Sequence, residues 1–166
     1  MNYQKGFTLI ELLLHLAISS LLLLASLMFI WTLLEARVKN QTIAEVETQG
    51  QQILTQITQI VRNAEAITTP SVGASGASLT LDVVESGSDP TTFSLSSGTV
   101  TITEGTGSPV NLNNNLVEVT SLNFSNLSRA DTPGTVQISF TVSYSSDSNQ
   151  NQYDYSKTFY GTASLR

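Results

Sequence analysis

Cysteine is absent from this 166-residue chain, and histidine occurs once, as His15. Without cysteine the protein can form no disulfide framework and can perform no thiol chemistry. A single histidine leaves too few nitrogen and sulfur ligands for a zinc site, and no phosphate-binding or dinucleotide-binding glycine motif occurs. The sequence also offers no catalytic arrangement of side chains. We therefore predict neither enzymatic activity nor a cofactor.

Positive charge is scarce as well. Lys and Arg together number 7 and Asp and Glu 13, which gives a formal net charge of −6. This balance argues against a general electrostatic affinity for nucleic acid, so no nucleic acid is expected as a partner. Only 12% of the residues are charged, and Ser, Thr, Asn and Gln supply the polarity instead. Such a composition is typical of an extracellular or surface-exposed domain.

One long apolar run dominates the N-terminal part of the chain. Between residues 7 and 34 the only ionisable side chains are Glu11 and His15. As a helix these 28 residues would extend about 42 Å, which exceeds the ~30 Å hydrocarbon core of a bilayer. The run is too long for the apolar core of an ordinary secretory signal. We therefore predict a transmembrane helix over residues 7–34. Cleavage by a signal peptidase near Ala25-Ser26-Leu27, giving a secreted protein, remains an alternative.

The residues that open this run form a motif. A short polar leader ends in Lys5-Gly6, and the next letters give G-F-T-L-I-E from Gly6 to Glu11. This motif resembles the processing site of type IV prepilins and pseudopilins. The resemblance implies that a prepilin peptidase removes residues 1–6 by cutting between Gly6 and Phe7. It also implies that the new amino terminus of Phe7 is methylated.

The resemblance further implies a location and a set of partners. The chain would cross the cytoplasmic membrane once, with its leader in the cytoplasm, and would then enter a pilus or pseudopilus outside the cytoplasm. Its expected partners are the prepilin peptidase, other pilin or pseudopilin subunits, an inner-membrane assembly platform and membrane lipid. The run Arg62-Asn63-Ala64 is similar to the J-type minor pseudopilins, which implies a minor subunit. The main alternative is a single-pass anchored β domain that binds a ligand outside the cell and does not polymerise.

Glu11 is the residue in this run that needs an explanation. A carboxylate deep in a bilayer costs on the order of 3 kcal/mol, and such residues are usually functional. Glu11 could simply reach water at the membrane interface. Alternatively, it could pair with the amine that cleavage creates at Phe7, within one chain or between packed subunits. The resemblance favours the second interpretation, because this glutamate is associated with subunit docking. His15, four residues later, is predicted to be a neutral polar residue and not a metal ligand.

Beyond residue 34 the helix is predicted to continue as an amphipathic segment over residues 35–67. Gly50 is the expected bend or weak point of this segment. Residues 68–78, which begin with Thr68-Thr69-Pro70, are predicted to end the helix and to form a linker. The apolar residues that recur at helical spacing are Val46, Ile53, Ile57, Ile60, Val61, Ala64 and Ile67.

Short alternating segments over residues 79–166 predict an antiparallel β domain. One face of its sheet should be covered by the apolar stripe of the helix, because a sheet of this kind buries one face. The expected fold class is therefore α+β and pilin-like, with a long N-terminal helix packed on an antiparallel sheet. The expected strands are Leu79–Val84, Thr91–Leu95, Thr99–Thr103, Leu116–Leu127 with a bulge near Ser121, Val136–Tyr144 and Tyr153–Ala163.

Two further clusters could bind a ligand. An aromatic cluster near the C-terminus could bind a glycan or a partner subunit, although packing on the sheet edge is the interpretation that we favour. An acidic and amide cluster could offer oxygen atoms to Ca²⁺, although a solvated turn explains it more simply. The first cluster is Tyr153, Tyr155, Phe159 and Tyr160, and the second is Asp147, Asn149, Asn151 and Asp154.

Overall fold

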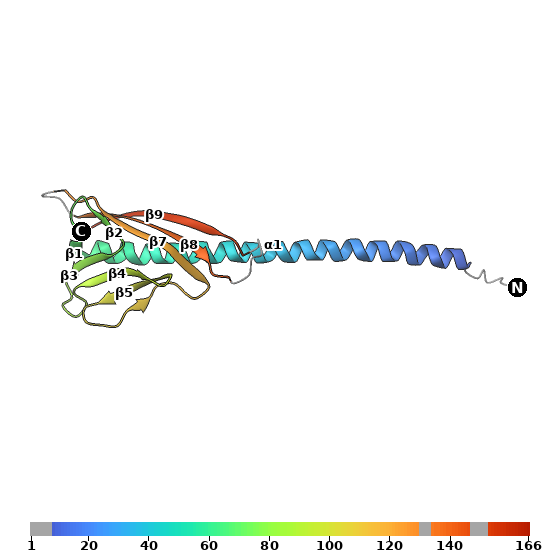
Figure 1. The fold of residues 1–166 in the computed structure, drawn as a ribbon, viewed down its shortest axis with the longest axis horizontal. Helices are drawn as coiled ribbons and strands as arrows, with labels where there is room; N and C mark the ends of the chain where they lie inside the picture. Colours follow the sequence, from blue (N-terminus) through green and yellow to red (C-terminus); the bar gives the residue numbers. More distant parts are fainter. Residues whose placement is uncertain (1–7, 130–133, 147–152) are drawn as a thin grey trace. The chain divides into compact units, whose positions relative to one another are not determined.

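The computed structural model describes residues 8–129, 134–146 and 153–166. The chain divides into two units, residues 1–39 and residues 40–166. Helix α1 (Leu9–Asn63) supplies the secondary structure of the first unit and also enters the second (Figure 1). In the second unit the helix packs against antiparallel strands, so the predicted α+β class is confirmed.

The strands of the second unit form two antiparallel sheets. The first has the order β1-β3-β4-β5-β6 and the second the order β2-β7-β8-β9. Strands of the first sheet are β1 (Ala64–Thr69), β3 (Leu79–Val83), β4 (Thr91–Ser96), β5 (Thr99–Glu104) and β6 (Val110–Asn111). Strands of the second are β2 (Ser75–Gly76), β7 (Val117–Asn126), β8 (Thr135–Tyr144) and β9 (Ser156–Ser164).

The sequence predicts one sheet, and the second sheet is therefore a correction. Asn113, whose side chain is 7% exposed, lies where the chain passes from one sheet to the other. Its Oδ1 accepts a hydrogen bond from the Val100 N–H at 2.8 Å, and its Nδ2 donates to the Val117 carbonyl at 2.9 Å. One buried side chain thus ties β5 of the first sheet to β7 of the second. This arrangement satisfies backbone groups that would otherwise be buried without partners.

The helix also ends four residues earlier than the predicted end at residue 67. Ala64 and the residues after it form β1, which pairs antiparallel with β3. The segment contains Ala and Glu, which are good helix formers, but the exposed edge of β3 offers a ladder of hydrogen bonds that outweighs this weak propensity. Pro70 disfavours the helical conformation at Thr69 and so acts in the same direction. The predicted linker over residues 68–78 contains the end of β1 and the short strand β2, which pairs with β7.

The other strand predictions agree closely with the structure. Five of the predicted strands overlap β3, β4, β5, β7 and β8 with ends that differ by one residue, and the last predicted strand contains most of β9. The bulge predicted near Ser121 is confirmed, because the pairing of β7 with β8 shifts register between Val119 and Ser121. The alternation of apolar and polar residues, which is strict in β8, arises because one face of the sheet is buried and the other is exposed.

A single stripe of α1 enters the core. Its buried positions recur at intervals of three and four residues, as expected for one face of a helix. Side chains from this stripe and from both sheets form one apolar cluster. The buried helix residues are Thr42, Val46, Gly50, Ile53, Ile57 and Val61.

Gly50 has a different role from the bend that the sequence predicts, because α1 continues through it. A side chain at this position would overlap three atoms of the Phe159 ring on β9. Glycine therefore lets the aromatic ring rest on the helix backbone. In a second close contact the glycine is on the strand and the side chain on the helix: a Cβ at Gly161 of β9 would lie 2.5 Å from Cδ1 of Leu54. These two glycines allow strand and helix to approach closely.

Candidate membrane anchor and assembly segment

Helix α1 begins with a side-chain cap at Thr8. The Thr8 carbonyl accepts hydrogen bonds from the Glu11 and Leu12 N–H groups, both at 3.1 Å, and the Thr8 hydroxyl lies 3.4 Å from the Glu11 nitrogen. Threonine is a preferred residue at this position because its oxygen atoms satisfy N–H groups that have no partner within the helix. The pair Thr8 and Glu11 has the spacing of a capping box, a signal that the sequence contains and that our sequence analysis missed.

This cap places Glu11 in the first turn of α1. The positive end of the helix dipole lies in that turn and stabilises a negative charge there. Glu11 is exposed in the isolated chain, and so is His15, one turn further along the helix. The other two predicted site residues, Gly6 and Phe7, lie outside the described residues.

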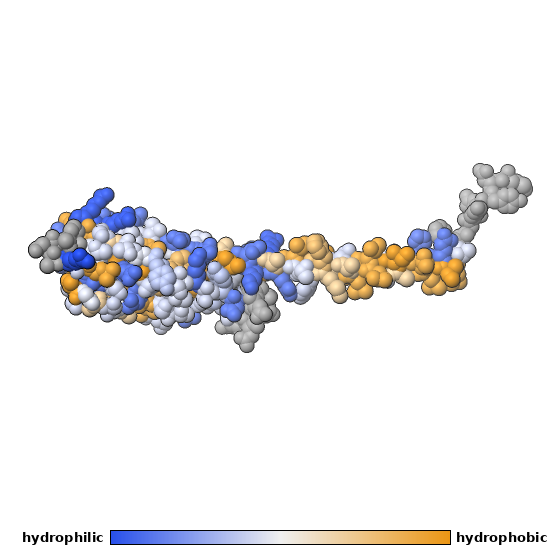
Figure 2. Space-filling view, turned by 90° about the horizontal axis from the view of Figure 1, so that it is seen from above, coloured by the Kyte–Doolittle hydropathy of each residue, from blue (hydrophilic) through white to orange (hydrophobic). Residues whose placement is uncertain are grey.

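The surface of α1 from Leu9 to Leu34 is almost entirely apolar. Every residue in this range is exposed, and the large side chains are 50% to 79% exposed. Figure 2 shows this stretch as a nearly continuous hydrophobic surface. The helix is long and apolar enough to cross a membrane by length and composition. An apolar surface of this size needs lipid or other apolar helices around it.

Three hydroxyl side chains within this stretch form hydrogen bonds inside the helix. The hydroxyls of Ser20 and Ser26 donate to backbone carbonyls at 2.9 and 2.8 Å, and that of Thr32 does the same at 2.8 Å. Bonds of this kind allow hydroxyl groups to lie in lipid at little cost. Near the end of the stretch, the indole N–H of Trp31 donates to Glu35 Oε1 at 3.0 Å. Tryptophan with a polar partner is typical of a membrane–water interface.

The C-terminal aromatic residues do not form one ligand site. Phe159 is 4% exposed and stacks on Phe140 with 5.4 Å between ring centroids. Tyr153 stacks on Tyr144 at 5.9 Å, and Tyr155 packs against the core. Tyr160 alone among the four is largely exposed, at 71%. Of the residues considered for Ca²⁺, all except Asp154 lie outside the described residues.

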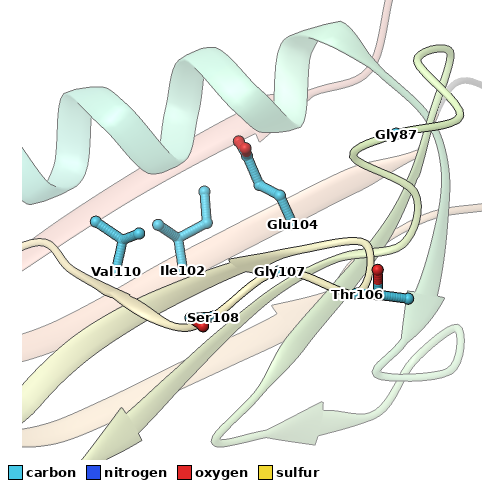
Figure 3. Close-up of a pocket in the computed structure, with 7 residues that line it drawn as sticks. All are labelled: Gly87, Ile102, Glu104, Thr106, Gly107, Ser108 and Val110. Carbon is cyan, nitrogen blue, oxygen red and sulfur yellow. The ribbon is translucent and has the colours of Figure 1, made fainter.

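A shallow pocket of about 470 Å³ opens beside β5 and β6. In Figure 3 the side chains of Ile102 and Val110 lie next to each other, and Glu104 points in the same direction. The remaining lining residues are Gly87, Thr106, Gly107 and Ser108. Among these described lining residues, Glu104 is the only titratable one. This arrangement offers no pair of groups for general acid–base chemistry.

Comparison with known proteins identifies the N-terminal motif. Residues 1–27 match the family described as the prokaryotic N-terminal methylation motif. Together with the long apolar helix, this match is consistent with a type IV pilin or pseudopilin and confirms the resemblance seen in the sequence. The motif supports a pilin-like substrate of a prepilin peptidase, and the apolar helix fits a single-pass membrane anchor. No curated protein and no solved structure matches the chain.

Proposed function

We propose that this chain is a structural subunit, a minor pilin or pseudopilin, of a type IV pilus or of a type II secretion-like filament. The observation that carries the proposal is the match of residues 1–27 to the methylation motif. The exposed apolar surface of α1 supports it, because this surface can be covered first by lipid and later by the same segment of neighbouring subunits.

In this proposal a prepilin peptidase cuts between Gly6 and Phe7 and methylates the amino terminus of Phe7. The mass of the mature N-terminal peptide tests the assignment directly. A chain that begins at methylated Phe7 is the expected result. A chain that begins at Met1 would indicate an uncleaved anchor, and one that begins near Leu27 would indicate release by a signal peptidase.

The role of Gly6 can be tested by substitution. Glycine lets the backbone approach the peptidase without a Cβ, so Gly6→Val should leave an uncut precursor in the membrane. Gln4→Val is the matched control, because it introduces the same side chain two residues earlier and should be processed normally. Normal maturation of the Gly6→Val chain would show that the cleavage site is elsewhere.

We further propose that Glu11 pairs with the amino terminus of Phe7 on a neighbouring subunit during assembly. An acid in an apolar segment is costly, and an opposite charge in a packed, low-dielectric bundle would compensate for that cost. Glu11→Ala should insert into the membrane at least as well as the unmodified chain, but its incorporation into filaments should fall. Glu11→Gln keeps the size of the side chain without its charge and should show the same loss.

Co-purification with the other filament subunits measures this incorporation. Glu35→Gln is the control, since it neutralises an acid of the same helix that lies beyond the apolar stretch. If Glu11→Gln is incorporated as efficiently as Glu35→Gln, the charge of Glu11 has no role in assembly.

A further inference from the structure

The outer face of the β2-β7-β8-β9 sheet, defined as the side chains of β7, β8 and β9 that alternate with the core residues, has an unusual composition. Apart from Glu118 and Tyr160, every one of these residues is Ser, Thr, Asn or Gln. Residues 40–166 in Figure 2 accordingly show much surface of intermediate hydropathy. The outer face consists of Glu118, Thr120, Ser121, Asn123, Ser125, Thr135, Gln137, Ser139, Thr141, Ser143, Ser156, Thr158, Tyr160, Thr162 and Ser164.

Tyr160 lies midway along β9, the edge strand of this sheet. It pairs across the ladder with Ser139 of β8, which in turn pairs with Asn123 of β7. Its ring is 71% exposed, whereas its neighbour Phe159, which points to the opposite side of the strand, is 4% exposed. A large exposed aromatic side chain set among small polar ones offers one apolar surface within a polar surround.

Many hydroxyl groups of the outer face are held by one another. Thr141 and Thr158 share a hydrogen bond of 2.9 Å, and Thr135 and Ser164 share one of 3.0 Å. A hydroxyl has one donor and two acceptor sites, so each of these groups keeps capacity for a further bond. Pairing fixes their side-chain rotamers and so lowers the entropic cost of binding a ligand.

Next to Tyr160, three polar side chains have no such partner. Ser139 lies directly opposite it, Gln137 is diagonal to it, and Thr162 follows two residues later on the same strand. Within the parts of the chain that the structure describes, none of these three side chains forms a hydrogen bond. They place free donors and acceptors beside the exposed ring, on the side where β9 pairs with β8.

We propose that this outer face binds a neutral glycan, with a sugar ring stacked on Tyr160 and its hydroxyls bonded to Gln137, Ser139 and Thr162. The electrostatics favour an uncharged ligand, because the face has no lysine or arginine to attract a polyanion. The scarcity of large apolar side chains disfavours a protein partner, whose interface would need several such anchors. A sugar matches both features, since it has apolar C–H faces and a rim of hydroxyl groups.

The test uses the full-length chain in a sugar-free zwitterionic detergent, since maltoside or glucoside headgroups would compete for the site. The probes are immobilised neutral glucan, mannan and galactan oligosaccharides, with sialylated and sulfated oligosaccharides as acidic comparators. Binding to at least one neutral series is expected. Tyr160→Ala should weaken that binding by about tenfold, the loss expected for one aromatic stacking contact, while Tyr160→Phe should retain most of it.

Val84→Ala is the matched control, because it removes an exposed apolar side chain that follows β3 of the other sheet and should leave binding unchanged. Three results would overturn the proposal. They are an absence of binding to every neutral probe, equal binding by Tyr160→Ala, and loss of self-association by Tyr160→Ala without any glycan binding. The measurement does not depend on cleavage after Gly6, so its outcome is independent of the proposed filament function.

Discussion

Substitution of Gly50 by alanine tests how the helix and the last strand fit together. In an exposed helix this change would stabilise the protein by about 1 kcal/mol, because alanine has the higher helix propensity. At Gly50 the added Cβ would overlap the ring of Phe159, so the ring or the strand that carries it must move. Helix propensity alone therefore predicts that Gly50→Ala raises the free energy of unfolding, whereas the packing against Phe159 predicts that it lowers it.

The cost of the overlap can be estimated from the contacts of Phe159. Forcing an extra carbon atom into a packed core costs about 1–3 kcal/mol. Displacing the ring also weakens its stacking on Phe140, where the centroids are 5.4 Å apart, a contact worth about 0.5–1.5 kcal/mol. After subtraction of the gain in helix propensity, we expect Gly50→Ala to lower the free energy of unfolding by about 0.5–3.5 kcal/mol.

Thermal unfolding of the detergent-solubilised chain, followed by circular dichroism, measures this change. A double-mutant cycle provides the control. In a Phe159→Ala background the overlap is gone, so Gly50→Ala should stabilise the protein by about 1 kcal/mol. If Gly50→Ala stabilises the unmodified chain, or has the same effect in both backgrounds, the proposed fit between Gly50 and Phe159 is incorrect.

Three further predictions concern the β-rich unit. A chain that begins at Arg37 should be soluble and should fold. A chain that begins at Ser71 should melt at a far lower temperature, because it lacks four fully buried helix side chains whose burial is worth about 6–12 kcal/mol. Equal melting temperatures of the two chains would contradict the packing of the helix on the sheets. Asn113→Ala should destabilise the protein by about 1–3 kcal/mol in a urea titration, because its two buried backbone partners lose their bonds, while exposed Asn115→Ala should change little. The hydrogen bond to Glu47 raises the pKa of Lys157 above its ordinary value of 10.5. The stability that this pair contributes should therefore be complete below pH 10.5 and should be lost as the pH rises through the raised pKa. Lys157→Met should remove this alkaline dependence from melts recorded as a function of pH.

Much of the fold could be predicted because its signals are local. Alternation along β7 and β8 and the recurrence of Val46, Ile53 and Ile57 follow from which side of each element faces the core. The predicted end of α1 was wrong because β1 pairs with β3, whose residues lie 11 to 19 positions away in the sequence, and this pairing overrides the helix propensity of Ala64 and Glu65. The division into two sheets was missed for the same reason, since it follows from which strands pair with one another.

Parts of the candidate site could likewise be predicted from the sequence, and other parts could not. The apolar stretch and the motif around Glu11 are continuous in sequence, so both could be found there. The cap at Thr8 could also have been found, because the spacing of Thr8 and Glu11 is a known helix-start signal. From the sequence, Tyr160 could be assigned to an aromatic cluster that could bind a glycan. The polar side chains beside it could not be found, since they come from different strands whose register only the folded sheet defines.

The contact between the last strand and the helix also constrains the order of folding. Lys157 and Glu47, which form an ion pair at 2.7 Å beside the Gly50 contact, are 110 residues apart in the sequence. Contacts of such long range form slowly, because most of the chain must be ordered before they can close. During synthesis, the apolar stripe of α1 stays uncovered on this side until β9 has been made. A chain truncated before residue 156 would therefore expose apolar surface around Gly50 and Leu54, the kind of surface that chaperones and proteases recognise.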